Sequence, residues 1–152
     1  MKRPLIIIMV MFLVFFLYTC AIEPETWDYT FKHDIEITSA RDAMNWITYN
    51  VMPVSDNRDY WQSPEETYAL RGGDCEDMCI LFMYLIHEQL GMNPELHILR
   101  VGDTGIYHAV VWCNDIYYNV AGNNTGVPDN MQYRENHNYG RTMWLATVYF
   151  KE

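Results

Sequence analysis

Cationic side chains are scarce in this sequence. Its 152 residues contain 10 Lys and Arg against 20 Asp and Glu, which gives a formal net charge of -10. Affinity for nucleic acid depends on clustered cations that meet the phosphates, and the sequence has no RRM or zinc-finger motif. We therefore expect no nucleic-acid partner. The hydrophobic half of the composition, which includes 5 Trp and 12 Tyr, predicts one packed globular domain.

Long apolar runs are also absent, except near the N-terminus. Met1 to Pro4 is short and positive, and the apolar run Leu5 to Leu17 that follows has the length of a signal-peptide core. It is short for a bilayer span. Thr19 and Cys20 then resemble the end of a bacterial lipoprotein signal, in which Cys20 becomes the lipidated N-terminus. An uncleaved anchor from Leu5 to Ile22 is the alternative.

These signals predict the domain organisation. We expect residues 1–19 to be a lipoprotein signal peptide, residues 20–35 to be a lipidated N-terminus and tether, and residues 36–152 to be the domain. Either form of attachment places the domain outside the cytoplasm, periplasmic or at the cell surface, with the membrane as a partner. An acidic surface does not bind anionic lipid by charge, so the anchor itself must make the attachment.

The domain is predicted to form helices first and strands afterwards. A Ser cap, helical spacing of apolar residues and a terminating Pro or Gly mark three helices. The third is apolar on more than one face and is expected to be the buried central helix. The helices span 39–51, 63–71 and Asp74 or Cys75 to Leu90, and the strands are Leu96–Val101, Ile106–Cys113, Ile116–Val120 and Thr142–Phe150. With residues 122–140 as a loop, the fold class is α+β with a small, mainly antiparallel sheet.

Cys75 is the candidate nucleophile. It lies at the expected start of the buried helix, where unpaired backbone N–H groups and the helix dipole favour a thiolate. Gly72 and Gly73 allow a sharp turn and leave room for a substrate. The neighbouring acidic residues act in the opposite direction because negative charge raises a thiol pKa. A cationic partner is therefore needed, and histidine is the obvious one.

His108 is the candidate partner. It lies in an otherwise apolar strand, where burying an imidazole without a bonding partner is unfavourable. If Asn114 and Asp115 form the next hairpin turn, the sequence numbers of two opposing residues add up to 229. Asn119 then lies on the same face as His108 and diagonal to it. An amide carbonyl there can orient the imidazole. A turn displaced by one residue would remove this pairing and leave Asp115 as the third member.

Three segments together resemble a known family. They are Tyr60–Thr67 (YWQSPEET), Gly73–Asp77 (GDCED) and Tyr107–Val110 (YHAV). Within residues 38–122 the chain is similar to bacterial transglutaminase-like cysteine peptidases, which have a papain-like fold. The resemblance implies Cys75 as nucleophile and His108 as general base and acid, with Asn119 where the family usually has Asp. It also implies an upstream oxyanion donor, for which Gln62 and Trp61 are candidates.

The sequence therefore predicts a membrane-tethered thiol hydrolase or acyltransferase that acts on the amide bond of a peptide or protein and needs no cofactor. Two alternatives remain: a catalytically degenerate binding module, and a scaffold lipoprotein whose cleft holds a partner peptide. Cys79 and Cys113 are expected to be small buried side chains, although a disulfide between them is conceivable outside the cytoplasm. A zinc site from Cys75, Cys79 and His108 is a weaker alternative because the Cys-x-x-Cys spacing is absent.

Overall fold

A computed structural model describes residues 29–55, 60–127 and 129–148 of the chain. The expected signal peptide, Cys20 and most of the expected tether lie outside these residues. Within the described part, no helix is both long and apolar enough to cross a bilayer. From Tyr29 onward the chain already contacts the domain, since Tyr29 and Phe31 pack on the core, and the Phe31 N–H donates to the Tyr84 hydroxyl at 3.3 Å.

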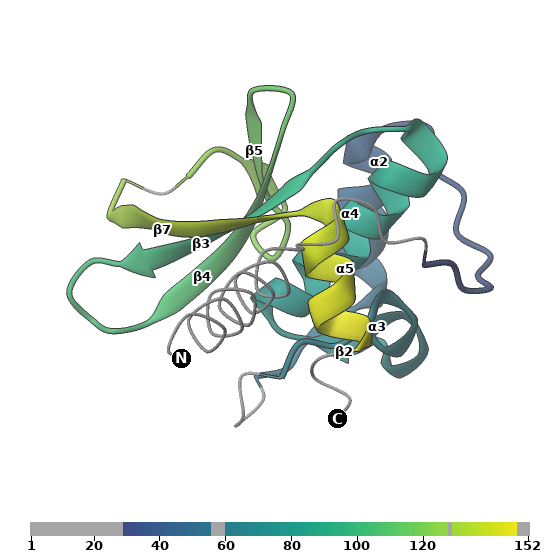
Figure 1. Ribbon diagram of the computed structural model, residues 1–152, viewed down its shortest axis with the longest axis horizontal. Helices are drawn as coiled ribbons and strands as arrows, with labels where there is room; N and C mark the ends of the chain where they lie inside the picture. The colour runs from purple at the N-terminus through teal and green to yellow at the C-terminus, as the bar shows by residue number, and fades with distance from the viewer. Residues whose placement is uncertain (1–28, 56–59, 128, 149–152) are drawn as a thin grey trace, which may run out of the picture.

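Helices precede the main sheet, as predicted. The elements are α2 (Ala40–Asn50), β1 (Met52–Pro53), α3 (Pro64–Leu70), β2 (Gly72–Gly73), α4 (Cys75–Leu90), β3 (Glu95–Val101), β4 (Tyr107–Cys113), β5 (Ile116–Asn119), β6 (Asn124–Thr125), β7 (Met131–Asn138) and α5 (Tyr139–Thr147). The antiparallel sheet has the order β6-β5-β4-β3-β7, and β1 pairs with β2 in parallel. Figure 1 shows the sheet on one side and the helices gathered around α4 on the other.

The predicted helix ends are confirmed. Ser39 accepts a hydrogen bond from the Asp42 N–H, and Ser63 forms a capping box with Glu66, so both side chains satisfy N–H groups that lack an intrahelical partner. Gly91 ends α4 in the left-handed conformation, at φ +65°. Helix α4 is the central element, as its sequence predicts, because all of its residues from Asp77 to Ile86 are buried.

Two predictions for the C-terminal third are wrong. The expected loop 122–140 contains β6 and β7, and β7 pairs with β3 from Met131 to Asn138 with a register shift at Arg134. The expected strand Thr142–Phe150 is instead helix α5, which ends at Thr147. The helix forms because the Asn138 side chain caps its first turn and because Met143, with no exposed surface, packs into the core with α4. Residues 132–136 of β7 are all exposed, so the strand lacks the apolar alternation that marks a half-buried strand.

Candidate active site

The head of α4 is held in place by one buried carboxylate. Asp77, 1% exposed, accepts the N–H of Gln62 at 2.8 Å and the N–H of Asp74 at 3.1 Å. It therefore ties the segment before α3 to the start of the helix that carries Cys75. A Cβ on Gly73 would lie 2.7 Å from the Asp77 Cβ, so only glycine allows this close approach.

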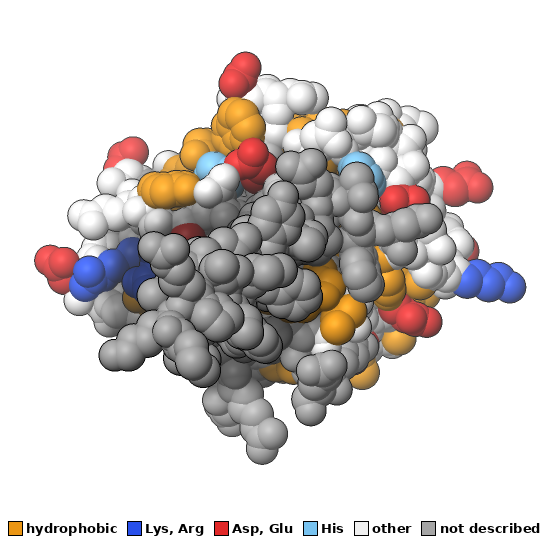
Figure 2. Space-filling view, viewed as in Figure 1, with side chains coloured by type: hydrophobic (Ala, Val, Ile, Leu, Met, Phe, Trp, Pro, Cys, Tyr) orange, Lys and Arg blue, Asp and Glu red, His pale blue; other side chains and the backbone are white. Residues whose placement is uncertain are grey.

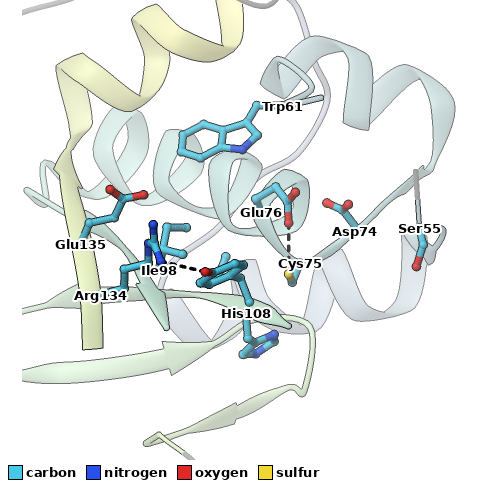
Figure 3. Close-up of a pocket in the computed structure, with 11 residues that line it drawn as sticks. Ser55, Trp61, Asp74, Cys75, Glu76, Ile98, His108, Arg134 and Glu135 are labelled. Carbon is cyan, nitrogen blue, oxygen red and sulfur yellow. Dashed lines mark hydrogen bonds between the residues drawn. The ribbon is translucent and has the colours of Figure 1, made fainter. Parts of the chain in front are cut away.

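Cys75 opens onto a cavity of about 620 Å³ between the head of α4 and the sheet. This is within the ordinary size range of small-ligand sites. In Figure 3, Cys75 and Glu76 lie on one side of this space and Arg134 and Glu135 on the other, with Trp61 above and His108 below. The described residues that line the cavity are Ser55, Trp61, Asp74, Cys75, Glu76, Ile98, Tyr107, His108, Ala109, Arg134 and Glu135.

The thiol of Cys75 is protonated in this arrangement. Burial raises its pKa to about 12, and the Glu76 carboxylate, which accepts a hydrogen bond from Sγ at 3.1 Å, acts in the same direction. The backbone of Ala109 lowers the pKa by a smaller amount. The expectation that the helix start would favour a thiolate is therefore reversed, because burial and Glu76 outweigh the helix dipole.

The predicted pairing of His108 with Asn119 is present. Strands β4 and β5 pair Val111 with Tyr118 and Cys113 with Ile116, which is the predicted register. The imidazole Nε2 lies 2.9 Å from Asn119 Oδ1. Asn114 and Asp115 form the turn, with φ of +50° and +62°, values typical of a two-residue hairpin.

The hydrogen bonds around Asn119 fix the tautomer of the imidazole. Asn119 Oδ1 also accepts the backbone N–H of Gly122 at 3.3 Å, so this atom acts as an acceptor. His108 Nε2 must then carry a proton and donate it, which leaves Nδ1 as a free acceptor in the neutral ring. A Cβ on Gly122 would lie 2.6 Å from Asn119 Nδ2, so a glycine at this position lets the amide take its place.

Cys75 and His108 line one cavity, but no hydrogen bond joins them. The thiol is bonded to Glu76 and the imidazole to Asn119. In Figure 3 the two side chains do not point toward each other, since the imidazole lies on the far side of β4 from the thiol. Alternation along the strand agrees, because the adjacent Ala109 packs into the core on the α4 side. A hydrogen bond between Sγ and the imidazole would require His108 to turn to the cavity side of β4.

The two oxyanion candidates have different surroundings. Trp61 lines the cavity, and its ring makes an edge contact with His137, with centroids 5.6 Å apart. Gln62 is not among the lining residues. Its backbone N–H is bonded to Asp77, and its side-chain Oε1 accepts from the Thr67 hydroxyl at 3.2 Å. The indole is therefore the better placed of the two.

Sequence reasoning missed one wall of the cavity. Arg134 and Glu135 reach it from β7, and Tyr107 from the start of β4. Arg134 donates to the Tyr107 hydroxyl at 2.7 Å, and its guanidinium lies 4.8 Å from the centre of that ring. Residues 134 and 135 fell within the predicted loop, so no pattern placed them on the sheet. Charged residues on an edge strand are a weak signal that could have indicated them.

The other two described cysteines, Cys79 and Cys113, are buried. Cys75, Cys79 and Cys113 are free thiols, and Cys79 Sγ donates to the carbonyl of Ala109 at 3.4 Å in the core. Among the residues that the structure describes, no group of three or more His, Cys, Asp or Glu side chains is arranged to hold a metal ion. Neither the disulfide nor the zinc alternative is supported by these positions.

No protein-family model and no curated protein matches the sequence. Among solved structures, LapG of Legionella pneumophila is 16% identical with a TM-score of 0.57, over 65% of this chain and 63% of that one. Its EGTA-treated form has a TM-score of 0.53, over 62% and 59%. A protein of Cytophaga hutchinsonii described as a candidate cysteine protease is 16% identical with a TM-score of 0.51, over 72% and 39%.

The chain spans less than two thirds of each of these structures. At this level of identity the similarity concerns the fold. The fold is α+β and of the papain/transglutaminase-like type, as the sequence predicts, with Cys75 at the head of the central helix and the sheet packed beside it.

Proposed function

We propose that this chain is a thiol enzyme of the transglutaminase-like type, which cleaves or transfers the acyl group of an amide or peptide bond through a thioester on Cys75. One observation carries the proposal: Cys75 begins the buried helix at a cavity that His108 also lines, and His108 is bonded to Asn119. A nucleophile, a base and an orienting group are the parts that such a reaction requires. Similarity to LapG and to a candidate cysteine protease supports this assignment.

The proposed cycle assigns each proton. Sγ of Cys75 attacks the carbonyl carbon while its proton passes to Nδ1 of His108, the ring nitrogen that Asn119 leaves free. His108 then gives that proton to the leaving amine nitrogen as the C–N bond breaks and the thioester forms. Water or a second amine attacks the thioester, loses a proton to His108, and Sγ leaves and regains it. Trp61 is the proposed side-chain oxyanion donor.

The first step needs a change at the resting site. The thiol must leave Glu76, and the imidazole, which lies on the far side of β4, must turn to the cavity side before Nδ1 comes within hydrogen-bond reach of Sγ. We propose that substrate entry displaces the Glu76 carboxylate, since the hydrogen bond from Sγ to Glu76 must break before the thiol proton can pass to His108. Removal of that carboxylate lowers the thiol pKa, because it is both an acceptor and a negative charge beside sulfur.

A catalytically degenerate binding module is the second candidate. The observation that favours it is the hydrogen bond from Cys75 to Glu76, with a thiol whose pKa is raised to about 12. A cavity of this kind can hold a peptide without reacting with it. Under either function, the lipoprotein-like leader supports an extracytoplasmic domain held at a membrane.

The test is a comparison of Cys75→Ala and His108→Ala with the wild-type full chain in a non-ionic detergent. Turnover is measured on a library of peptides bearing a fluorogenic amide. If the chain is an enzyme, both variants lose turnover while their circular dichroism spectra stay unchanged. In the wild type, acyl-Cys75 is then detected by mass spectrometry after rapid acid quenching. Turnover that survives in Cys75→Ala contradicts the proposed role of the thiol. Absence of turnover in the wild type, with peptide binding retained, favours the binding module.

A further inference from the structure

Carboxylates approach the cavity from two elements. Asp74 and Glu76 lie at the head of α4, and Glu135 comes from β7 on the opposite wall. Figure 3 shows the carboxylates of Glu76 and Glu135 on either side of the space below Trp61, with Asp74 beyond Cys75. The cavity that exposes the nucleophile is therefore bordered by negative charge from both the helix and the sheet.

The one cationic side chain among the described lining residues is already engaged. Arg134 donates to the Tyr107 hydroxyl and stacks over that ring, and no ion pair joins it to Asp74, Glu76 or Glu135. Glu135 lies 3.8 Å from His137 Nε2, which is a charged partner only when that ring is protonated. The described lining thus holds three carboxylates against one guanidinium, and none of the three forms an ion pair with it.

Two further observations indicate that the cavity favours a positive group. Asp74 Oδ1 is buried and has no hydrogen-bond partner, which is costly for a carboxylate oxygen. Burial and the adjacent Asp74 raise the pKa of Glu76 to about 7, so a proton already reduces the negative charge near neutral pH. A ligand cation would serve the same purpose and would supply donors to the unsatisfied oxygen.

The charge of the whole chain also favours a positively charged ligand. The chain has a formal net charge of -10. Figure 2 shows acidic side chains spread around one face, while cationic ones occur only at its left and right ends. A field of this sign attracts cations to the cavity and repels acidic peptides.

We infer that the cavity binds a peptide segment carrying a lysine or arginine side chain next to the amide that Cys75 attacks, with Glu76, Glu135 and Asp74 around the cation. The inference rests on the proposed function only in identifying this segment as the substrate. Contact between the cation and Glu76 would also draw that carboxylate away from Sγ. Recognition of a basic residue and release of the thiol would then be one event.

Binding is tested separately from turnover. The full-length Cys75→Ala chain in non-ionic detergent is titrated with short fluorescent alanine peptides that carry arginine at each position in turn, and with a matched set carrying neutral citrulline. Citrulline has nearly the shape of arginine without its charge, so the two sets isolate the ionic contribution. We expect the best arginine peptide to bind at least about tenfold more tightly than its citrulline partner, with the difference reduced at high salt.

Variants of the cavity carboxylates test whether these side chains cause the preference for arginine over citrulline. Glu135→Gln and Glu76→Gln, each in the Cys75→Ala background, should bring arginine binding close to citrulline binding. Glu36→Gln, which removes the same charge from an exposed position outside the cavity, should leave the ratio unchanged. Equal binding of the two sets, or no binding of either, overturns the inference. A charge preference that Glu135→Gln and Glu76→Gln do not reduce also overturns it.

The two proposals fail in different ways. Wild-type chain that binds arginine peptides selectively yet never forms acyl-Cys75 contradicts the proposed enzyme and leaves the cationic site standing. Turnover that depends on Cys75 but proceeds equally on arginine and citrulline substrates contradicts the cationic site and leaves the enzyme standing.

Discussion

The thiol of Cys75 donates a hydrogen bond to the carboxylate of Glu76, the next residue in the chain, at 3.1 Å. Cys75 Sγ thereby has an acceptor that stabilises its protonated form, in addition to the burial that raises its pKa to about 12. The N-terminus of α4 supplies the opposite influence, but the positive end of a helix dipole amounts to only a fraction of a charge. After burial, Glu76 is thus the side chain that contributes most to keeping the nucleophile protonated.

Replacing Glu76 should make the thiol more reactive. Glu76→Gln removes a negative charge beside Sγ, so we expect the pKa of Cys75 to fall by about one unit or more. At a fixed pH below that value, the thiolate fraction and the iodoacetamide alkylation rate of Cys75 should rise about tenfold. The rate is measured for each cysteine by mass spectrometry over a range of pH.

Glu36→Gln provides the matched control for charge, since Glu36 is exposed and is not among the residues that line the cavity. Its alkylation profile should coincide with that of the wild type. If Glu76→Gln alkylates at the wild-type rate, Glu76 does not determine the thiol pKa, and burial alone accounts for the protonated state.

Asn119 should determine which nitrogen of the neutral His108 ring carries the proton. Asn119→Ala removes the acceptor of the Nε2–H, and Gly122→Ala places a Cβ only 2.6 Å from Asn119 Nδ2, so the amide must shift. Both variants should lose the preference for the Nε2–H tautomer, which nitrogen-15 NMR of the labelled imidazole detects directly. Any Cys75-dependent turnover should fall by about two orders of magnitude or more.

Asn130→Ala, at an exposed turn position, serves as the control for an asparagine deletion. It should keep both the wild-type tautomer and the wild-type turnover. A clear Nε2–H signature in Asn119→Ala would mean that the tautomer has another origin, and Asn119 would then be a structural residue only.

Local signals allowed most of the helical part and the hairpin to be predicted. Ser39 and Ser63 cap their helices with a side chain that needs no tertiary partner, so sequence alone indicates where these helices begin. Asn114 and Asp115 readily adopt positive φ, which fixes the hairpin register and places Asn119 beside His108.

The failures concern elements whose identity depends on distant contacts. Tyr139–Thr147 is rich in residues that favour strands, yet Met143 and Ala146 are buried in the core and the segment is helical. Strand β7 is polar and follows β3 in the sheet although it is far from it in sequence. Because β7 was not predicted, Glu135 and Arg134 could not be placed at the cavity.

Asp77 should be the most sensitive position at the head of α4. Its replacement by Ala leaves the partly buried N–H groups of Gln62 and Asp74 without their acceptor, and each such loss costs about 1–3 kcal/mol. We expect the free energy of unfolding to fall by about 2–5 kcal/mol, measured by denaturant titration of the full chain in detergent.

Asp103→Ala is the comparison for removal of a carboxylate. Asp103 is fully exposed and lies 3.8 Å from Arg100, a type of surface pair worth about 0–1 kcal/mol. A destabilisation by Asp77→Ala no larger than that of Asp103→Ala would show that the two hydrogen bonds to Asp77 are replaced by water or by rearrangement of the loop.

Glu76 should also make the stability of the fold depend on pH. Its pKa is raised from 4.5 to about 7 in the folded chain, mainly by burial, so the folded state holds a proton that the unfolded state has released between these values. The unfolded chain therefore binds fewer protons there, and the free energy of unfolding must fall as pH rises from about 4.5 to about 7. Glu76→Gln, which carries no charge at any of these pH values, should flatten this part of the profile, whereas Glu36→Gln should not. The measurement is a series of denaturant midpoints across this interval for the wild type and both variants. A profile that slopes equally in all three proteins would assign the pH dependence to other groups and would place the Glu76 carboxylate in contact with solvent.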